Sequence, residues 1–320
     1  MDARDAPASR KEQTRERELR AKGTRLAAAG SLGAVVAITA VIVFSSSGGG
    51  SSSHAQRTSA GARSRSVTAS TTGSHAPVKP GTAEAPILAY HVINASPSQS
   101  GAAPELYVPA DEFSAQMDAL KAAGWHAVTL DQLQAYWARG VSLGPGKPIV
   151  IAFDGGYASQ YTNALPVLKR LGWVGVEDLP ATARPASDGG LTDVQIRGLL
   201  SARWELVAQG NSQTNLTVLT GAQLSNEVAA ARQTIHSRYA VPVNWFSYPS
   251  GAYNPTVTAA VRAAGYVGAT TLIPGWASTQ DDRFRLPRLQ VVGGTTPAGL
   301  LSQIATAQAN AAPPAASPGG

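Results

Sequence analysis

Residues 147–157, which read KPIVIAFDGGY, decide the fold class of this chain. The apolar run at 149–153 is typical of a buried strand, and it ends in a single acid, Asp154, followed by Gly155 and Gly156. In α/β barrels the chemistry lies at the carboxyl ends of the parallel strands. The stretch therefore predicts an α/β fold with the rim of a functional site at Asp154.

Short apolar runs alternate with amphipathic stretches over residues 84–309. The predicted strands are 86–92, 126–130, 148–153, 173–178, 204–209, 245–249, 266–271 and 286–292. The predicted helices are 110–124, 130–140, 161–172, 192–202, 221–239, 254–265 and 296–308. This alternation predicts parallel strands joined by crossover helices, and the number of strands favours a barrel over an open sheet.

Composition excludes several classes of site and partner. The chain of 320 residues has no cysteine, which excludes disulfides, thiolate metal ligands and a cysteine nucleophile. Its formal net charge is +6, but residues 1–25 alone hold eight Lys or Arg against five Asp or Glu. Because no basic stripe with interleaved aromatic residues is present, a nucleic-acid partner is not expected.

The N-terminal part predicts a membrane anchor. Residues 26–44 carry no charge and are long enough to cross a bilayer as a helix, and the basic segment 1–25 before them is expected on the cytoplasmic side. The body would then be extracellular on a single-pass protein of the cell membrane. The alternative is a secreted protein whose signal peptide is cleaved late. Residues 45–83 and 310–320 have the composition of a flexible linker and a disordered tail.

The strand ends, taken in order, resemble the polysaccharide deacetylase (NodB-homology) family. The segments that carry the resemblance are PILAYHVI at 86–93, the run 113–133, FDGGY with the helix after it at 149–173, WELVAQGNSQTNLTVLT at 204–220, FSYPSGAYN at 246–254 and RFRLPRLQV at 283–291. Together they cover nearly all of residues 84–305. The resemblance implies a distorted (β/α) barrel over residues 84–309.

The resemblance also implies a chemistry, namely metal-assisted removal of an acetyl group from an N-acetylated sugar. In the family an Asp and two His hold a divalent ion, commonly zinc, and a base Asp directly precedes the ligand Asp. Carried over, the base position is Asp154 and the ligand positions fall on Gly155, Gln209 and Gln213. The arginine position of the third motif falls on Ser247. Neither glycine nor the glutamine amide replaces a carboxylate or an imidazole on such an ion, so no cofactor is expected.

Further residues near the motif ends are candidates for binding substrate. They are Tyr90, His91, Tyr157, Tyr248 and Pro249. Aromatic rings with a polar tip suit sugar recognition.

Two acids after the fourth predicted strand, Glu177 and Asp178, are expected to form a solvated strand end.

Two functions remain open from the sequence. The first is a catalytically degenerate family member that binds cell-wall glycan or a partner without hydrolysis. The second is an active hydrolase of acetyl C–N bonds in N-acetylated polysaccharide that uses a rearranged site. A third, less favoured, is a metal-free hydrolase in which Asp154 and His91 act together.

Overall fold

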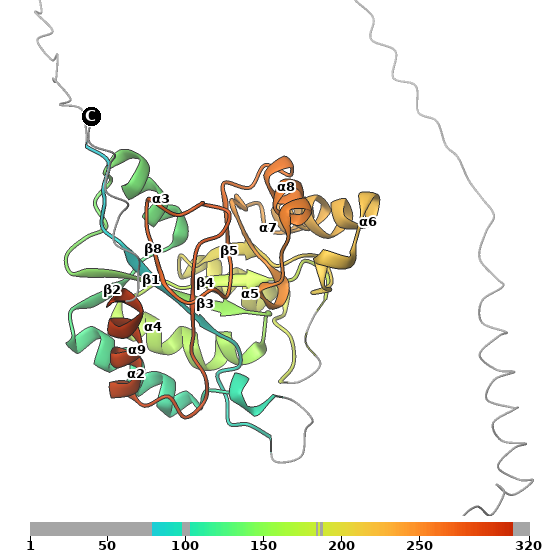
Figure 1. Ribbon diagram of the computed structural model, residues 1–320. Coiled ribbons are helices and arrows are strands. Elements are labelled where there is room, and N and C mark those ends of the chain that lie inside the picture. The colour runs from blue at the N-terminus through green and yellow to red at the C-terminus, as the bar shows by residue number, and fades with distance from the viewer. Residues whose placement is uncertain (1–78, 98–102, 184, 186–187, 310–320) are drawn as a thin grey trace, which may run out of the picture. The chain divides into compact units, whose positions relative to one another are not determined.

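The computed structural model describes residues 79–97, 103–183, 185 and 188–309 (Figure 1). The expected segments 1–25, 26–44 and 310–320, and the linker up to residue 78, lie outside these described residues. Within them, no helix has both the length and the apolar composition to cross a membrane.

The strands join into one sheet. They are β1 (Ala85–Tyr90), β2 (Trp125–Ala127), β3 (Lys147–Asp154), β4 (Val176–Leu179), β5 (Glu205–Ala208), β6 (Trp245–Ser247), β7 (Gly268–Thr270), β8 (Trp276–Ala277) and β9 (Leu289–Gln290). The order is β7-β6-β5-β4-β3-β1-β8, with β2 on β3 and β9 on β1. The strand pairs of this sheet are parallel, except for the antiparallel pair β1 with β8. Each predicted strand overlaps an observed one, and only the short β8 was not predicted.

The curved sheet is a half-barrel, because its strands do not follow one another in a complete ring. Strand β1 pairs directly with β3, and β2 reaches only the start of β3. On the open side, Thr270 of β7 forms a parallel bridge with Leu286, and β9 then pairs with β1. The segment from Leu286 to β9 therefore spans the gap between the two sides of the sheet.

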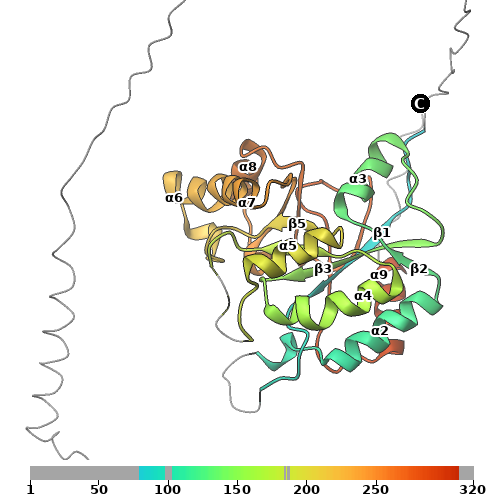
Figure 2. The same ribbon diagram turned by 180° about the vertical axis from the view of Figure 1, so that it is seen from behind.

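The helices surround the strands (Figures 1 and 2). They are α2 (Ala110–Ala122), α3 (Leu130–Arg139), α4 (Leu165–Leu171), α5 (Asp193–Ser201), α6 (Gly221–Ser225), α7 (Ala231–Tyr239), α8 (Pro255–Ala263) and α9 (Pro297–Ala309). Capping boxes at Thr129 and Thr192 start α3 and α5. Left-handed glycines, Gly140 and Gly172, end α3 and α4, as the sequence predicts.

Alternation along the strands divides the core into two clusters. Side chains such as Leu88, Ile151 and Phe153 belong to the cluster that packs under the surrounding helices. Their neighbours Val150 and Ala152 belong to the second cluster, which fills the inside of the curved sheet. Successive side chains of a strand point to opposite faces, so the parity of a residue number decides which cluster a strand residue joins.

A half-buried acidic pair, Glu205 and Asp131, lies inside the sheet at the amino ends of the strands. Glu205 Oε2 accepts a hydrogen bond of 3.2 Å from the Asp131 backbone N–H. The Asp131 carboxylate in turn accepts hydrogen bonds from Asn244 and Trp245. Burial, and then the negative charge of Asp131, raise the pKa of Glu205 well above its ordinary value.

Replacing Glu205 by Gln is expected to raise the melting temperature at neutral pH and to leave it nearly unchanged in acid. The raised pKa keeps Glu205 protonated in the folded protein at pH values where the unfolded chain has released the proton. Its contribution to stability is therefore complete below the unfolded pKa and is lost as pH rises through the folded pKa. Thermal melts of both proteins from about pH 4 to about pH 8 measure this difference. If the melting temperatures of the two proteins differed by the same amount at every pH, the raised pKa of Glu205 would be contradicted.

Candidate active site

Strand parity brings one set of polar residues together at the carboxyl ends of the strands. Asp154 follows Val150 and Ala152 on β3, and Asp178 follows Val176 on β4, so both carboxylates belong to the inner face. By the same parity Gln209, just after β5, and Ser247, the last residue of β6, face the inside of the sheet. All four residues are buried. The mouth of the half-barrel is thus a buried polar layer above an apolar core.

One arginine holds this layer together. Arg288 is 1% exposed and reaches in from the segment that spans the open side of the sheet. Its Nη1 and Nη2 donate to the two carboxylate oxygens of Asp154 at 2.7 and 3.0 Å. Nη1 also donates to Asp178 Oδ2 at 2.9 Å, and Nε donates to the Thr271 carbonyl at 2.8 Å. The guanidinium is therefore fixed by a two-pronged ion pair and two further bonds.

Asp154 and Asp178 both bind the Arg288 guanidinium, and their pKa values are shifted in opposite directions. Burial raises the pKa of Asp154, but the Arg288 guanidinium, His91 and hydrogen bonds outweigh it and hold that pKa at about 2. Burial and the charge of Asp154 raise the pKa of Asp178 well above its ordinary value. The cluster therefore consists of an ionised Asp154 and a cationic Arg288 beside an Asp178 that keeps its proton to higher pH than an ordinary aspartic acid. The expectation that Asp178 and Glu177 form a solvated strand end is wrong, because both are at most 1% exposed.

His91 lies beside the cluster, where the sequence predicts it. Its Nε2 is 3.8 Å from Asp154 Oδ2, and its side chain is 17% exposed. Burial lowers the pKa of His91, Asp154 opposes this effect and Arg288 adds to it. The buried Gln160 amide donates to the carbonyls of both His91 and Asp154 at 2.8 Å and so fixes the backbone of the two residues relative to each other.

The three positions that the family resemblance assigns to metal ligands also converge. Gln213 Nε2 donates to Gln209 Oε1 at 2.7 Å. A Cβ atom added to Gly155 would lie 3.4 Å from Gln213 Nε2. The same Cβ would lie 2.7 Å from Cε2 of Tyr157, so the Tyr157 ring covers Gly155. The family resemblance implies an acid and two imidazoles at this place, but two amides and an aromatic ring occupy it.

The loop that carries Gln213 is held by a residue that the sequence reasoning did not find. The Glu227 carboxylate accepts hydrogen bonds from the backbone N–H groups of Asn211 and Ser212 and from the Ser212 hydroxyl. Gln213 follows with a positive φ of 59°. Since Glu227 itself is buried, the loop is fixed before any ligand arrives.

Two of the predicted substrate-binding tyrosines do not face the mouth. Tyr90 and Tyr248 are fully buried and belong to the cluster under the helices. Tyr90 donates to Gln116 Oε1 at 2.8 Å, and Tyr248 donates to the Phe284 carbonyl at 3.0 Å. They leave no ring surface for a sugar in this structure, and Pro249 is also buried. Tyr157 is the half-buried aromatic residue of the set, and its role in binding stays a prediction.

Arg288 and Asp178, like Glu227, are functional residues that sequence reasoning missed. The signal for Arg288 was present, because a single arginine interrupts the apolar run 286–292. A charge inside a buried strand needs a partner.

Comparisons with known proteins agree with the fold. The family model for polysaccharide deacetylases matches residues 143–269, which span β3 to β7 and include Asp154, Gln209 and Ser247. By this match, residues 143–269 are a polysaccharide deacetylase domain. A relative named for the same family, YxkH of Bacillus subtilis (strain 168), is 27% identical over 212 residues, which are 66% of this chain and 73% of YxkH.

Solved structures of deacetylases share the fold. The Streptococcus pyogenes deacetylase PplD in complex with acetate aligns with a TM-score of 0.64 at 20% identity, over 70% of this chain and 99% of PplD. The polysaccharide deacetylase BC0361 from Bacillus cereus aligns with a TM-score of 0.61 at 22% identity, over 69% of each chain. The α/β architecture is therefore that of the polysaccharide deacetylases.

The donor set of this polysaccharide deacetylase domain does not fit the divalent ion of the family. A zinc-like ion needs about three protein ligands, and neutral amides are poor ones. In the part of the chain that the structure describes, no group of three or more His, Asp or Glu could hold a metal ion. Gly155 has a φ of +97°, and the Tyr157 ring blocks a side chain there. Arg288 also engages both oxygens of Asp154.

Replacing Asp154 by Asn is expected to destabilise the protein by about 3–5 kcal/mol, because it leaves the buried Arg288 without its main counter-charge. The matched change Asp178→Asn is expected to cost less than about 1 kcal/mol, since Asn mimics the protonated acid. Urea unfolding at neutral pH compares the two variants. Equal losses of stability would show that the charges are not distributed as described.

Proposed function

We propose that this polysaccharide deacetylase-family protein binds N-acetylated glycan at the mouth of its half-barrel and leaves the acetyl group in place. The observation that carries the proposal is the hydrogen-bonded amide pair, Gln209 and Gln213, at the positions assigned to the metal-binding histidines. The proposal is also supported by the low pKa of Asp154 and by its ion pair with Arg288.

Asp154 is held in a form that does not suit a general base. Arg288 donates to both of its carboxylate oxygens, and the pKa of about 2 makes it a very weak proton acceptor at neutral pH. An efficient base has a pKa near the working pH. The His91 imidazole at 3.8 Å is beyond hydrogen-bond reach of Asp154 Oδ2, so the two do not form an aligned catalytic pair.

The amide pair has the groups needed to hold an acetamido group. Gln213 Nε2 is used as donor and Gln209 Oε1 as acceptor in their mutual bond. Among the described residues, Gln209 Nε2 and Gln213 Oε1 have no hydrogen-bond partner. One is a donor and the other an acceptor, so together they match the carbonyl and the N–H of a secondary amide. The Tyr157 ring, which lies against Gly155, would pack on the sugar.

The place of action follows from the sequence. We propose that residues 26–44 anchor the chain in the cell membrane and that the body faces the cell-wall polysaccharide outside. The uncharged run after a basic segment supports this topology. Secretion after late cleavage of a signal peptide is the alternative.

The full chain is expected to bind oligomers of N-acetylglucosamine and to release no acetate from them. Gln213→Ala is expected to weaken binding by about fivefold to tenfold, the value of one lost hydrogen bond. Calorimetric titration measures affinity, and an acetate assay on the same samples measures turnover. Gln308→Ala, at an exposed site on α9 at the opposite end of the sheet, is the matched control and should bind like wild type.

The affinity for glucosamine oligomers, which lack acetyl groups, distinguishes this proposal from the alternatives. Glucosamine oligomers should bind less tightly than their N-acetylated counterparts, because they lack the amide. Equal affinity for both would contradict recognition of the acetamido group. Release of acetate by metal-stripped protein would instead show an active hydrolase with a rearranged site.

Wild-type protein is expected to bind zinc weakly, and the triple variant Gly155→Asp, Gln209→His, Gln213→His is expected to gain zinc binding. The variant supplies one carboxylate and two imidazoles, a donor set that suits zinc. Its melting temperature without zinc should fall, because the new side chain at φ +97° displaces the Tyr157 ring. Zinc titration with melts in chelator tests both effects. The double variant that retains Gly155 is the control and should bind zinc less tightly.

A further inference from the structure

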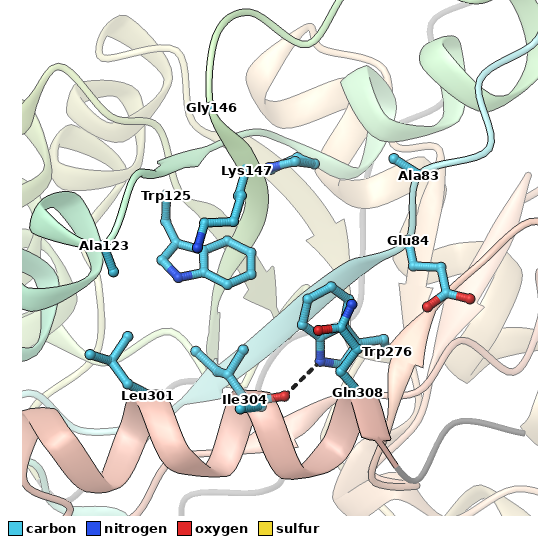
Figure 3. Close-up of a pocket in the computed structure, with 12 residues that line it drawn as sticks. Ala83, Glu84, Ala123, Trp125, Gly146, Lys147, Trp276, Leu301, Ile304 and Gln308 are labelled. Atoms are coloured by element: carbon cyan, nitrogen blue, oxygen red, sulfur yellow. Dashed lines mark hydrogen bonds between the residues drawn. The ribbon is translucent and has the colours of Figure 1, made fainter.

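A groove lies at the amino ends of the strands, at the opposite end of the sheet from the candidate active site. It has a volume of about 670 Å³ and lies between the C-terminal helix α9 and the starts of β1, β2 and β3 (Figure 3). Its walls are mainly apolar, with Trp125 and Trp276 on the sheet side and Leu301 and Ile304 on α9. The proposed function does not use this groove.

The two tryptophans are fixed in place. The Trp276 indole N–H donates to the Ile304 carbonyl of α9 at 2.9 Å. The Trp125 ring meets Trp276 edge to face with centroids 5.7 Å apart, and Lys147 Nζ lies 4.8 Å from the Trp125 ring centroid. Trp125 lines the groove, and among the described residues its indole N–H has no hydrogen-bond partner. A ligand that brings a carbonyl oxygen would satisfy it.

Rigid aromatic walls with a spare indole donor are typical of sites that bind proline-rich segments. Such segments form an extended helix without internal hydrogen bonds, so their backbone carbonyls are free to accept. The chain itself contains one directly after α9. Residues 310–320 read NAAPPAASPGG, with three prolines and no charge. By contrast, residues 45–78 carry Arg57, Arg63 and Arg65, which suit an apolar groove less well.

We propose that residues 310–320 fold back along α9 and occupy this groove. Gln308 lines the groove, so residue 310 starts at its edge. Asn310 is a residue type that tolerates the left-handed conformation with which many helices end.

The lengths of the two segments agree with this arrangement. The groove wall from Leu301 to Gln308 is about 10 Å long at the rise of an α-helix. Residues 313–318 span about 19 Å as a polyproline helix. The prolines therefore reach both tryptophans after one reversal of the chain.

The test compares the full chain with a chain that stops at Ala309, both labelled with 5-fluorotryptophan. The signals of Trp125 and Trp276 are assigned with Trp→Phe variants. Removal of residues 310–320 is expected to shift these two ¹⁹F signals and to increase their broadening by a soluble nitroxide, with the other tryptophan signals unchanged. A synthetic peptide of residues 310–320 should reverse the change, and the same peptide with Pro313→Ala and Pro314→Ala should not.

Matched variants on α9 keep the test independent of folding. Ala305 is exposed and lines the groove, so Ala305→Glu in the full chain should reproduce the effect of the deletion. Thr306 is exposed but does not line the groove, so Thr306→Glu should have no effect.

Three results would overturn the proposal. Identical tryptophan signals in the two chains would show that residues 310–320 do not occupy the groove. A change that follows deletion of residues 1–78 instead would assign it to the N-terminal segment. Signals that depend on protein concentration would assign it to a second copy of the chain.

Discussion

The Arg288 guanidinium between Asp154 and Asp178 is the interaction on which the rest of the mouth depends. A single buried cation joins β3, β4 and the segment that spans the open side of the half-barrel. Removing Asp154 or Arg288 leaves the other as a buried charge without its main partner, which costs several kcal/mol. The same contact also sets the chemistry, because it holds Asp154 as a weakly basic anion and raises the pKa of Asp178.

Strand parity explains which parts of the site the sequence could predict. The order of strands and helices follows from the alternation of apolar runs, and each predicted strand overlaps an observed one. The same alternation could have shown that Tyr90 and Tyr248 face the helices, since each has the opposite parity to the inward-facing residues of its strand. Their assignment to the mouth came from position in the motif alone. The prediction did not consider to which face of the sheet each side chain points.

Long-range pairing explains what the sequence could not predict. Arg288 is 134 residues from Asp154 along the chain, and the two meet only because the last strand segment returns beside β1. No pattern in the sequence around either residue predicts this contact. The misplacement of Asp178 has the same cause, because a strand end is solvated unless a distant segment covers it. The short antiparallel β8 also depends on a distant partner, β1, rather than on its own two residues.

Diffraction at the zinc absorption edge, from wild-type crystals soaked in zinc, tests the central claim most directly. The account predicts no anomalous peak among Gly155, Gln209 and Gln213, and electron density that shows Arg288 on both oxygens of Asp154. An anomalous peak at that place, with Asp154 turned away from Arg288 toward the ion, would contradict it.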